Sequence, residues 1–280
     1  MKNSTAYKSQ KARDKTLVSY DEFLQYWPVP YQSQYIFTSF GETHVLISGS
    51  TTSKPLVLLH GAAGNSCMWF YNIAALSKQF RVIAVDIIGE PGKSAGTRPL
   101  YKSEDYSHWL KEVLENFDIK NAALCGLSLG AMLAYRYALC YPESVSSLAL
   151  LAPPLANQSF AVMYRAVLAN LFPKMFAMKF LNYISASAVQ WPEWGVKAFI
   201  VPYHAYKFNF DKVPLMHEYD LSKLPEKTLI LLGKQEVLCN PAEVVLNMNS
   251  INVDIIPGAK HTINADQPAI VNARLLDFLC

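Results

Sequence analysis

One serine near the middle of the chain stands between two glycines, in the pentapeptide GLSLG around Ser128. The apolar run before it (122–125) predicts a strand, and the run after it (129–139) predicts a helix. A sharp turn from strand to helix brings the two elements so close that the positions two residues before and two residues after the turn residue must be very small. Gly126 and Gly130 meet this requirement, so the pattern predicts a nucleophile elbow that exposes the serine hydroxyl.

Short apolar runs that end in polar or glycine-bearing turns recur along the chain and predict an eight-stranded sheet. Between several of them lie helical patterns, at 103–117, 129–139 and 267–278. Because strands and helices alternate, we expect an α/β fold with a mostly parallel sheet flanked by helices. The strand candidates are 35–40, 43–47, 56–59, 82–85, 122–125, 147–151, 228–232 and 253–256.

The composition and charge exclude several classes of protein. Of the 280 residues, 51% are hydrophobic and 17% charged, which is enough apolar material for a large core. The formal net charge of +3 is small and no basic block occurs, so no nucleic-acid partner is expected. The five cysteines are scattered without a CxxC pair, which argues against zinc and for a reduced, cytoplasmic protein. No run predicts a signal peptide or a membrane span, and the oligomeric state stays open.

The sequence divides into three parts. Residues 1–19 are polar and predict an N-terminal arm, and residues 20–152 with 212–280 form the expected α/β core. Residues 153–211 contain no clear strand pattern and predict a helical cap over the carboxyl edge of the sheet. We expect most bulky side chains of this insertion to form its own core, and a small cluster of them to line an apolar pocket. They are Phe160, Met163, Tyr164, Phe172, Met175, Phe176, Met178, Trp191, Trp194, Phe199, Tyr203 and Tyr206.

A serine hydroxyl needs a base, and a histidine base needs an orienting carboxylate. In this architecture the chain order is serine, acid, histidine. His261 follows the last predicted strand and precedes the last helix, so it is the expected base. Glu236 follows the strand at 228–232 and is the expected acid, with Asp220 and Asp254 as weaker candidates.

The developing oxyanion needs two backbone N–H donors. One is expected from Leu129, directly after the nucleophile, and the other from the loop His60-Gly61-Ala62-Ala63-Gly64, where we choose Ala62. His60 itself is expected to anchor that loop. The run ending in Gly92-Lys93-Ser94 has Ile87 where a phosphate loop requires glycine, so no nucleotide cofactor is expected, and no metal either.

These segments resemble the α/β-hydrolase fold superfamily, in its capped, esterase-like branch. The matching pieces are LVLLHGAAGNSCMW, VIAVDIIGEPGKSAG, CGLSLG, LLGKQEV and IPGAKHTINADQP, in the family's order. The resemblance implies that Ser128 is the nucleophile, Glu236 the acid and His261 the base. It also implies that Asp86 and Gly89 form a structural turn. The family usually has aspartate as the acid, and its turn pattern is stretched here to DIIGEPGKS.

The expected function is hydrolysis of small or medium apolar carboxylic esters through an acyl-enzyme. An amidase or peptidase, or a hydrolase of C–C bonds, would use the same triad. A peptidase that selects a free amino terminus would need carboxylates in the cap, where only Glu193 precedes Asp211. The alternative from another class is a non-catalytic protein that binds a small molecule in the same pocket.

Overall fold

The computed structural model describes residues 6–155, 160–187, 190–209, 211–248 and 251–280, so parts of the ranges 1–19 and 153–211 lie outside it. Its centre is one eight-stranded sheet with the strand order β1-β2-β4-β3-β5-β6-β7-β8. The strands are β1 (Gln32–Thr38), β2 (Gly41–Ser48), β3 (Pro55–Leu59), β4 (Arg81–Val85), β5 (Ala122–Leu127), β6 (Val145–Leu151), β7 (Thr228–Gly233) and β8 (Asn252–Ile256).

All eight predicted strands are present, most of them one or two residues longer than their apolar runs. The hairpin β1–β2 is antiparallel, β2 pairs antiparallel with β4, and the other pairs are parallel. The central strands are buried on both faces, which is why they read as continuous apolar runs rather than as alternating ones. The mostly parallel α/β sheet is therefore confirmed.

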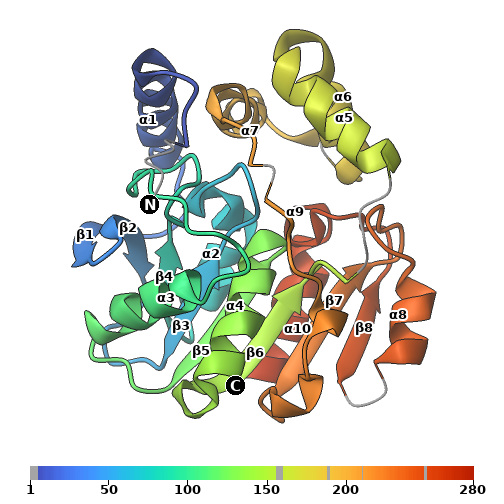
Figure 1. The fold of residues 1–280 in the computed structure, drawn as a ribbon. Coiled ribbons are helices and arrows are strands. Elements are labelled where there is room, and N and C mark those ends of the chain that lie inside the picture. Colours follow the sequence, from blue (N-terminus) through green and yellow to red (C-terminus); the bar gives the residue numbers. More distant parts are fainter. Residues whose placement is uncertain (1–5, 156–159, 188–189, 210, 249–250) are drawn as a thin grey trace.

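Helices cover both faces of the sheet (Figure 1). Side chains from α3, α4 and α8 pack on one face, and those from α2, α9 and α10 pack on the other. None of the helices in the described ranges combines the length and the apolar character of a membrane-spanning helix. The bounds are α1 (Gln10–Leu24), α2 (Phe70–Leu76), α3 (Asp105–Glu115), α4 (Leu129–Cys140), α5 (Phe160–Leu171), α6 (Pro173–Ile184), α7 (Glu193–Ala205), α8 (Pro241–Asn247), α9 (Ile263–Asp266) and α10 (Pro268–Leu279).

The insertion after β6 forms the helices α5, α6 and α7, which lie above the sheet with α1 beside α7 (Figure 1). The expected polar arm at 1–19 is thus partly helical, because α1 begins at Gln10 and continues to Leu24. The Ser9 side chain caps this helix by accepting from the Ala12 N–H. The Tyr26 ring stacks on Trp194 of α7 at a centroid distance of 4.8 Å, so aromatic packing joins the N-terminal segment to the cap.

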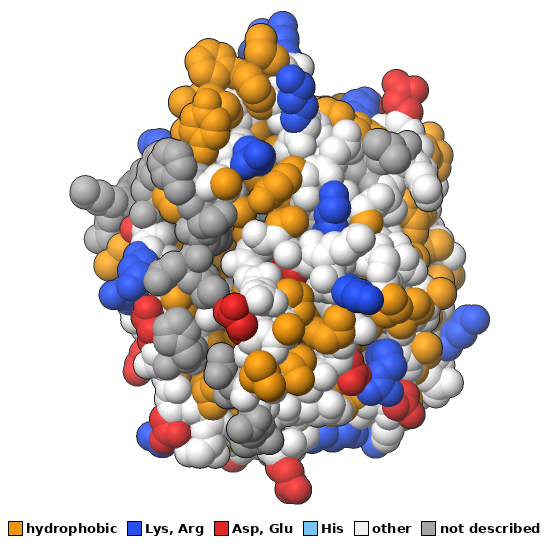
Figure 2. All heavy atoms as spheres, turned by 90° about the vertical axis from the view of Figure 1, so that its right-hand side faces the viewer, with side chains coloured by type: hydrophobic (Ala, Val, Ile, Leu, Met, Phe, Trp, Pro, Cys, Tyr) orange, Lys and Arg blue, Asp and Glu red, His pale blue; other side chains and the backbone are white. Residues whose placement is uncertain are grey.

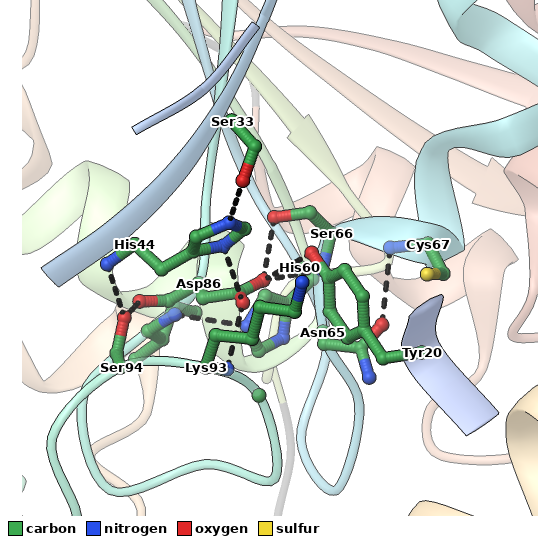
Figure 3. Close-up of polar contacts among 12 residues, drawn as sticks. Tyr20, Ser33, His44, His60, Asn65, Ser66, Cys67, Asp86, Lys93 and Ser94 are labelled. Carbon is green, nitrogen blue, oxygen red and sulfur yellow. Dashed lines mark hydrogen bonds and ion pairs between the residues drawn. The ribbon is translucent and has the colours of Figure 1, made fainter. Parts of the chain in front are cut away.

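A buried carboxylate at the end of β4 ties together the loops above the sheet (Figure 3). Asp86 Oδ1 accepts from the N–H and the hydroxyl of Ser66 at 2.9 and 2.7 Å and from the Tyr20 hydroxyl of α1 at 3.1 Å. Asp86 Oδ2 bonds the His44 ring of β2 at 3.0 Å and the Lys93 N–H at 2.9 Å. Burial by itself would raise the pKa of Asp86. The hydrogen bonds and the nearby histidines outweigh that effect and hold the pKa well below its usual range.

We predict that Asp86→Ala lowers the free energy of unfolding by about 3–5 kcal/mol, because it leaves several buried donors without an acceptor. Chemical denaturation monitored by circular dichroism measures this difference. The control is Asp277→Ala, which removes a carboxylate from an exposed pair with Arg274 and should change stability little. Equal stability of the two variants would contradict the structural role of Asp86.

Candidate active site

The turn between β5 and α4 has the backbone of a nucleophile elbow. Ser128 has φ +52° and ψ −110°, a conformation that a non-glycine residue adopts only under tertiary constraint. A Cβ on Gly126 would lie 2.3 Å from the backbone of Gly130, and one on Gly130 would lie 2.0 Å from the carbonyl oxygen of Leu59. Only glycine at both positions allows α4 to pass this close to β3 and β5.

The structure brings Ser128, His261 and Glu236 together. His261 Nε2 lies 2.9 Å from Ser128 Oγ, and His261 Nδ1 lies 3.0 Å from Glu236 Oε2. Ser128 follows β5, Glu236 follows β7 and His261 follows β8. The carboxyl ends of these strands share one edge of the sheet. This chain of hydrogen bonds lets the imidazole accept the serine proton while the carboxylate fixes its tautomer.

Glu236 is held as an anion in a buried place. Burial raises its pKa, but the facing His261 and the N–H groups of Val237 and Leu238 overcome that effect, so the net pKa is lowered. The two N–H donors bond Oε1 at 2.7 and 3.0 Å and fix the carboxylate in the turn after β7. An ionised carboxylate in this place stabilises a protonated histidine.

The competing candidates lie elsewhere. Asp220 bonds the backbone and hydroxyl of Ser222, and Asp254 is paired with Arg274. His44 is bonded to Asp86, and His108 is half exposed on α3. None of these side chains contacts Ser128 or His261 in the described part of the chain.

The predicted oxyanion donors lie beside the serine. Ala62, Leu129 and Ser128 line the same cavity, and the Leu129 N–H belongs to the first turn of α4, where helical N–H groups lack intrahelical acceptors. His60 anchors the Ala62 loop, because its Nε2 accepts from the Ile87 N–H at 3.0 Å and its Nδ1 lies 2.8 Å from the Gly61 carbonyl oxygen.

A second buried carboxylate supports this loop, and sequence reasoning missed it. Glu90 Oε2 accepts from the Ala63 N–H at 2.6 Å, and Glu90 Oε1 accepts from the Tyr206 hydroxyl of the cap at 3.2 Å. Ala63 has φ +57°, so its backbone is held in an unusual conformation directly after Ala62. The only signal in the sequence was the stretched turn DIIGEPGKS, in which Glu90 occupies an unassigned position.

The loop that carries His261 is bonded to the cap. The His261 N–H donates to the Ile184 carbonyl oxygen at the end of α6 at 3.0 Å. Asp266 accepts from the Ser185 hydroxyl at 2.7 Å with Oδ1 and from the Lys260 N–H at 2.9 Å with Oδ2. The loop of His261 and the end of α6 are therefore positioned by the same carboxylate.

An apolar cavity of about 550 Å³ opens on the serine. Of the twelve bulky residues named for the insertion, six line it, whereas Tyr164, Phe172 and Met175 are largely exposed and belong to neither pocket nor core. Within the described ranges no group of three His, Cys, Asp or Glu side chains is placed to hold a metal ion. The six lining residues are Met163, Trp191, Trp194, Phe199, Tyr203 and Tyr206.

We predict that Gly130→Ala lowers the free energy of unfolding by more than about 4 kcal/mol or prevents folding, because the new methyl group would overlap backbone carbonyls. The matched control is Gly195→Ala in α7, where the nearest atoms to a Cβ are 3.6 Å away. The free energy of unfolding of Gly195→Ala should rise by about 0.5–1 kcal/mol, because alanine has a higher helix propensity than glycine. Denaturant titration of both proteins is the test, and a Gly130→Ala protein as stable as wild type would contradict the elbow geometry.

Burial raises the pKa of Glu90 from 4.5 to about 7. Arg98, the Ala63 N–H and the Tyr206 hydroxyl counteract the burial only in part. The folded chain therefore binds the proton of the Glu90 carboxyl more tightly than the unfolded chain does. The contribution of this proton to the free energy of unfolding is complete below pH 4.5 and is lost as pH rises through about 7.

We therefore predict that the stability of wild type falls relative to Glu90→Gln by about 3 kcal/mol between about pH 4.5 and pH 8. Urea unfolding across this range measures the difference. Glu226→Gln, at an exposed position, is the control and should follow wild type at every pH. A difference between wild type and Glu90→Gln that stays constant with pH would contradict the assigned burial effect.

Comparisons with known proteins agree with this architecture. Residues 54–187 match the family described as alpha/beta hydrolase fold. The chain is 34% identical to the uncharacterized carboxylesterase nap of Bacillus subtilis, over 93% of this chain and 90% of that protein. It is 29% identical to carboxylesterase YbfK of the same organism, over 94% and 92% of the two chains.

A solved structure is similar over nearly the whole length. The crystal structure of naproxen esterase (carboxylesterase NP) from Bacillus subtilis superposes with a TM-score of 0.87 at 32% identity and covers 98% of this chain and 100% of its own. The elbow, the sheet order and these similarities lead to one conclusion: the chain belongs to the α/β-hydrolase fold family.

Proposed function

We propose that this protein is a carboxylesterase that cleaves small or medium apolar esters through Ser128, His261 and Glu236. The observation that carries the proposal is the hydrogen-bonded chain of these three side chains, of which Ser128 and His261 line an apolar cavity. The names of the relatives, carboxylesterase and naproxen esterase, support the same reaction class.

The proposed reaction begins when Ser128 Oγ attacks the ester carbonyl carbon and His261 Nε2 takes its proton. Glu236 keeps the imidazolium oriented through Nδ1. The negative oxygen of the tetrahedral intermediate is held by the N–H groups of Ala62 and Leu129, the latter at the positive end of α4. His261 then protonates the leaving alcohol, and a water activated by His261 hydrolyses the acyl-enzyme.

The cavity favours apolar acyl or alcohol groups. Aromatic side chains of α7 and the following segment supply much of its wall, and its exposed surface is mainly apolar. Sites of this kind bind apolar groups by burial and use few polar groups to orient the reacting bond. Two charged side chains also line the cavity, Asp211 at the end of the insertion and Lys212 directly after it.

We propose the cytoplasm as its compartment. The five cysteines are free in the structure, as expected under reducing conditions.

We predict that wild type is labelled by a fluorophosphonate probe and hydrolyses p-nitrophenyl esters of graded chain length. Ser128→Ala and His261→Ala should lose labelling and lower kcat by about 10⁴-fold or more, and Glu236→Gln by about 10³–10⁴-fold. Active-site labelling read on a gel and initial rates measure these effects.

The controls are Ser50→Ala and His108→Ala, which remove the same side chains at positions away from the cavity and should behave as wild type. Absent labelling in folded wild type would favour the alternative that the pocket only binds a small molecule. Faster cleavage of a p-nitroanilide than of the matching ester would favour an amidase.

A further inference from the structure

The outer face of the α5–α6 hairpin is apolar and yet lies in solvent. Met163, Tyr164, Leu171, Phe172 and Met175 each expose between 49% and 64% of their surface. Single exposed apolar residues are ordinary, but a contiguous group of large ones marks a contact surface. In Figure 2, hydrophobic side chains gather at the projecting top of the molecule, where Figure 1 places this hairpin.

Both faces of the hairpin are apolar. Tyr164 and Leu171 are seven residues apart, two turns of α5, and therefore share its outer side. Val162, Ala166 and Ala169 on the other side are buried in the molecule. The inner face thus packs on the rest of the molecule, and the outer face is additional apolar surface exposed to solvent.

Positive charge surrounds this outer face. The two helices carry Arg165, Lys174 and Lys179, all exposed, and no Asp or Glu occurs between Glu143 and Glu193. In the described part of the chain none of the three forms an ion pair. The Lys8 ammonium lies at the C-terminal end of α5, where it donates to the Asn170 carbonyl oxygen at 2.7 Å. An exposed apolar face on two helices that carry basic but no acidic residues is complementary to an anionic lipid surface.

We propose that the outer face of the α5–α6 hairpin docks the protein on anionic lipid surfaces, with its apolar side chains in the interface and its cations on the headgroups. A second copy of the chain fits this face poorly, because a two-fold contact would oppose the cations of one copy to those of the other without carboxylates between them. The projecting, convex shape of the hairpin in Figure 2 also suits insertion into lipid better than contact with a flat protein surface.

The face borders the mouth of the catalytic cavity. Met163 lines the cavity and is also 49% exposed, and the neighbouring Val162 and Ala166 line the cavity as well. Docking therefore places the cavity entrance next to the lipid. An ester dissolved in the lipid could then reach Ser128 without crossing bulk water. This last step rests on the proposed esterase function.

The test is flotation of the whole protein with lipid vesicles. Wild type should bind vesicles of phosphatidylglycerol mixed with phosphatidylcholine, lose this binding at high salt, and not bind phosphatidylcholine alone. Lys174→Glu with Lys179→Glu should weaken binding at least about thirtyfold, and Phe172→Ser with Met175→Ser more than about tenfold. The matched control pairs are Lys78→Glu with Lys102→Glu and Phe37→Ser with Leu246→Ser, at exposed positions away from the hairpin, which should bind as wild type.

Hydrolysis of a soluble p-nitrophenyl ester separates docking from catalysis. The hairpin variants should keep the wild-type rate in solution and lose only the binding to vesicles. The proposal is wrong if wild type does not float with the anionic vesicles, or if the hairpin variants float as well as wild type. It is also wrong if wild type self-associates in light scattering and the hairpin variants become monomeric, because the face would then be an interface between copies.

Discussion

The geometry of the candidate active site depends on how closely α4 approaches the sheet. Gly126 and Gly130 remove the two Cβ atoms that would keep helix and strands apart, and the resulting turn forces Ser128 to a positive φ. This one constraint sets the direction of the hydroxyl and places the N-terminus of α4 beside it. The helix ladder, the strand pairing and the Ser128 N–H bond to Leu151 hold the strained residue in place.

Buried carboxylates hold the loops around the site in place. Asp86 joins α1, β2 and the loop after β3, Glu90 holds the backbone next to Ala62, and Asp266 joins the loop of His261 to the end of α6. A buried acceptor with several N–H and O–H partners fixes a loop more firmly than apolar packing does, since each bond has a direction. Asp266 follows His261 closely in the chain, at the end of α9, whereas Glu90 and Asp86 reach the loop of Ala62 by accepting from the N–H groups of Ala63 and Ser66.

The cap joins these parts into one unit. Glu90 accepts from Tyr206 of the cap, the His261 loop bonds the end of α6, and α1 packs on α7. The cap therefore contributes to the wall of the cavity and to the positions of the Ala62 loop and of His261. Its outer side, by contrast, is exposed and presents apolar and basic groups together.

The eight strands, the helices α3, α4 and α10, the elbow, and Ser128, Glu236 and His261 as residues that the structure brings together could be predicted from the sequence. These features depend on local patterns: apolar runs, glycines that a tight turn requires, and polar residues directly after strands. The helix α1 was not predicted, because its sequence is polar over the first two turns and its stability comes from packing on α7.

What the sequence by itself determined is the fold and the residues proposed for the site, since both follow from short-range patterns. Only the tertiary structure decided which carboxylates support the loops, which insertion residues line the cavity and which face solvent. Glu90, Tyr206 and Ala63 are far apart in the chain, and their contact exists only because the cap folds back over the sheet. Long-range contacts of this kind leave no periodic pattern, so no segment of the sequence carries them.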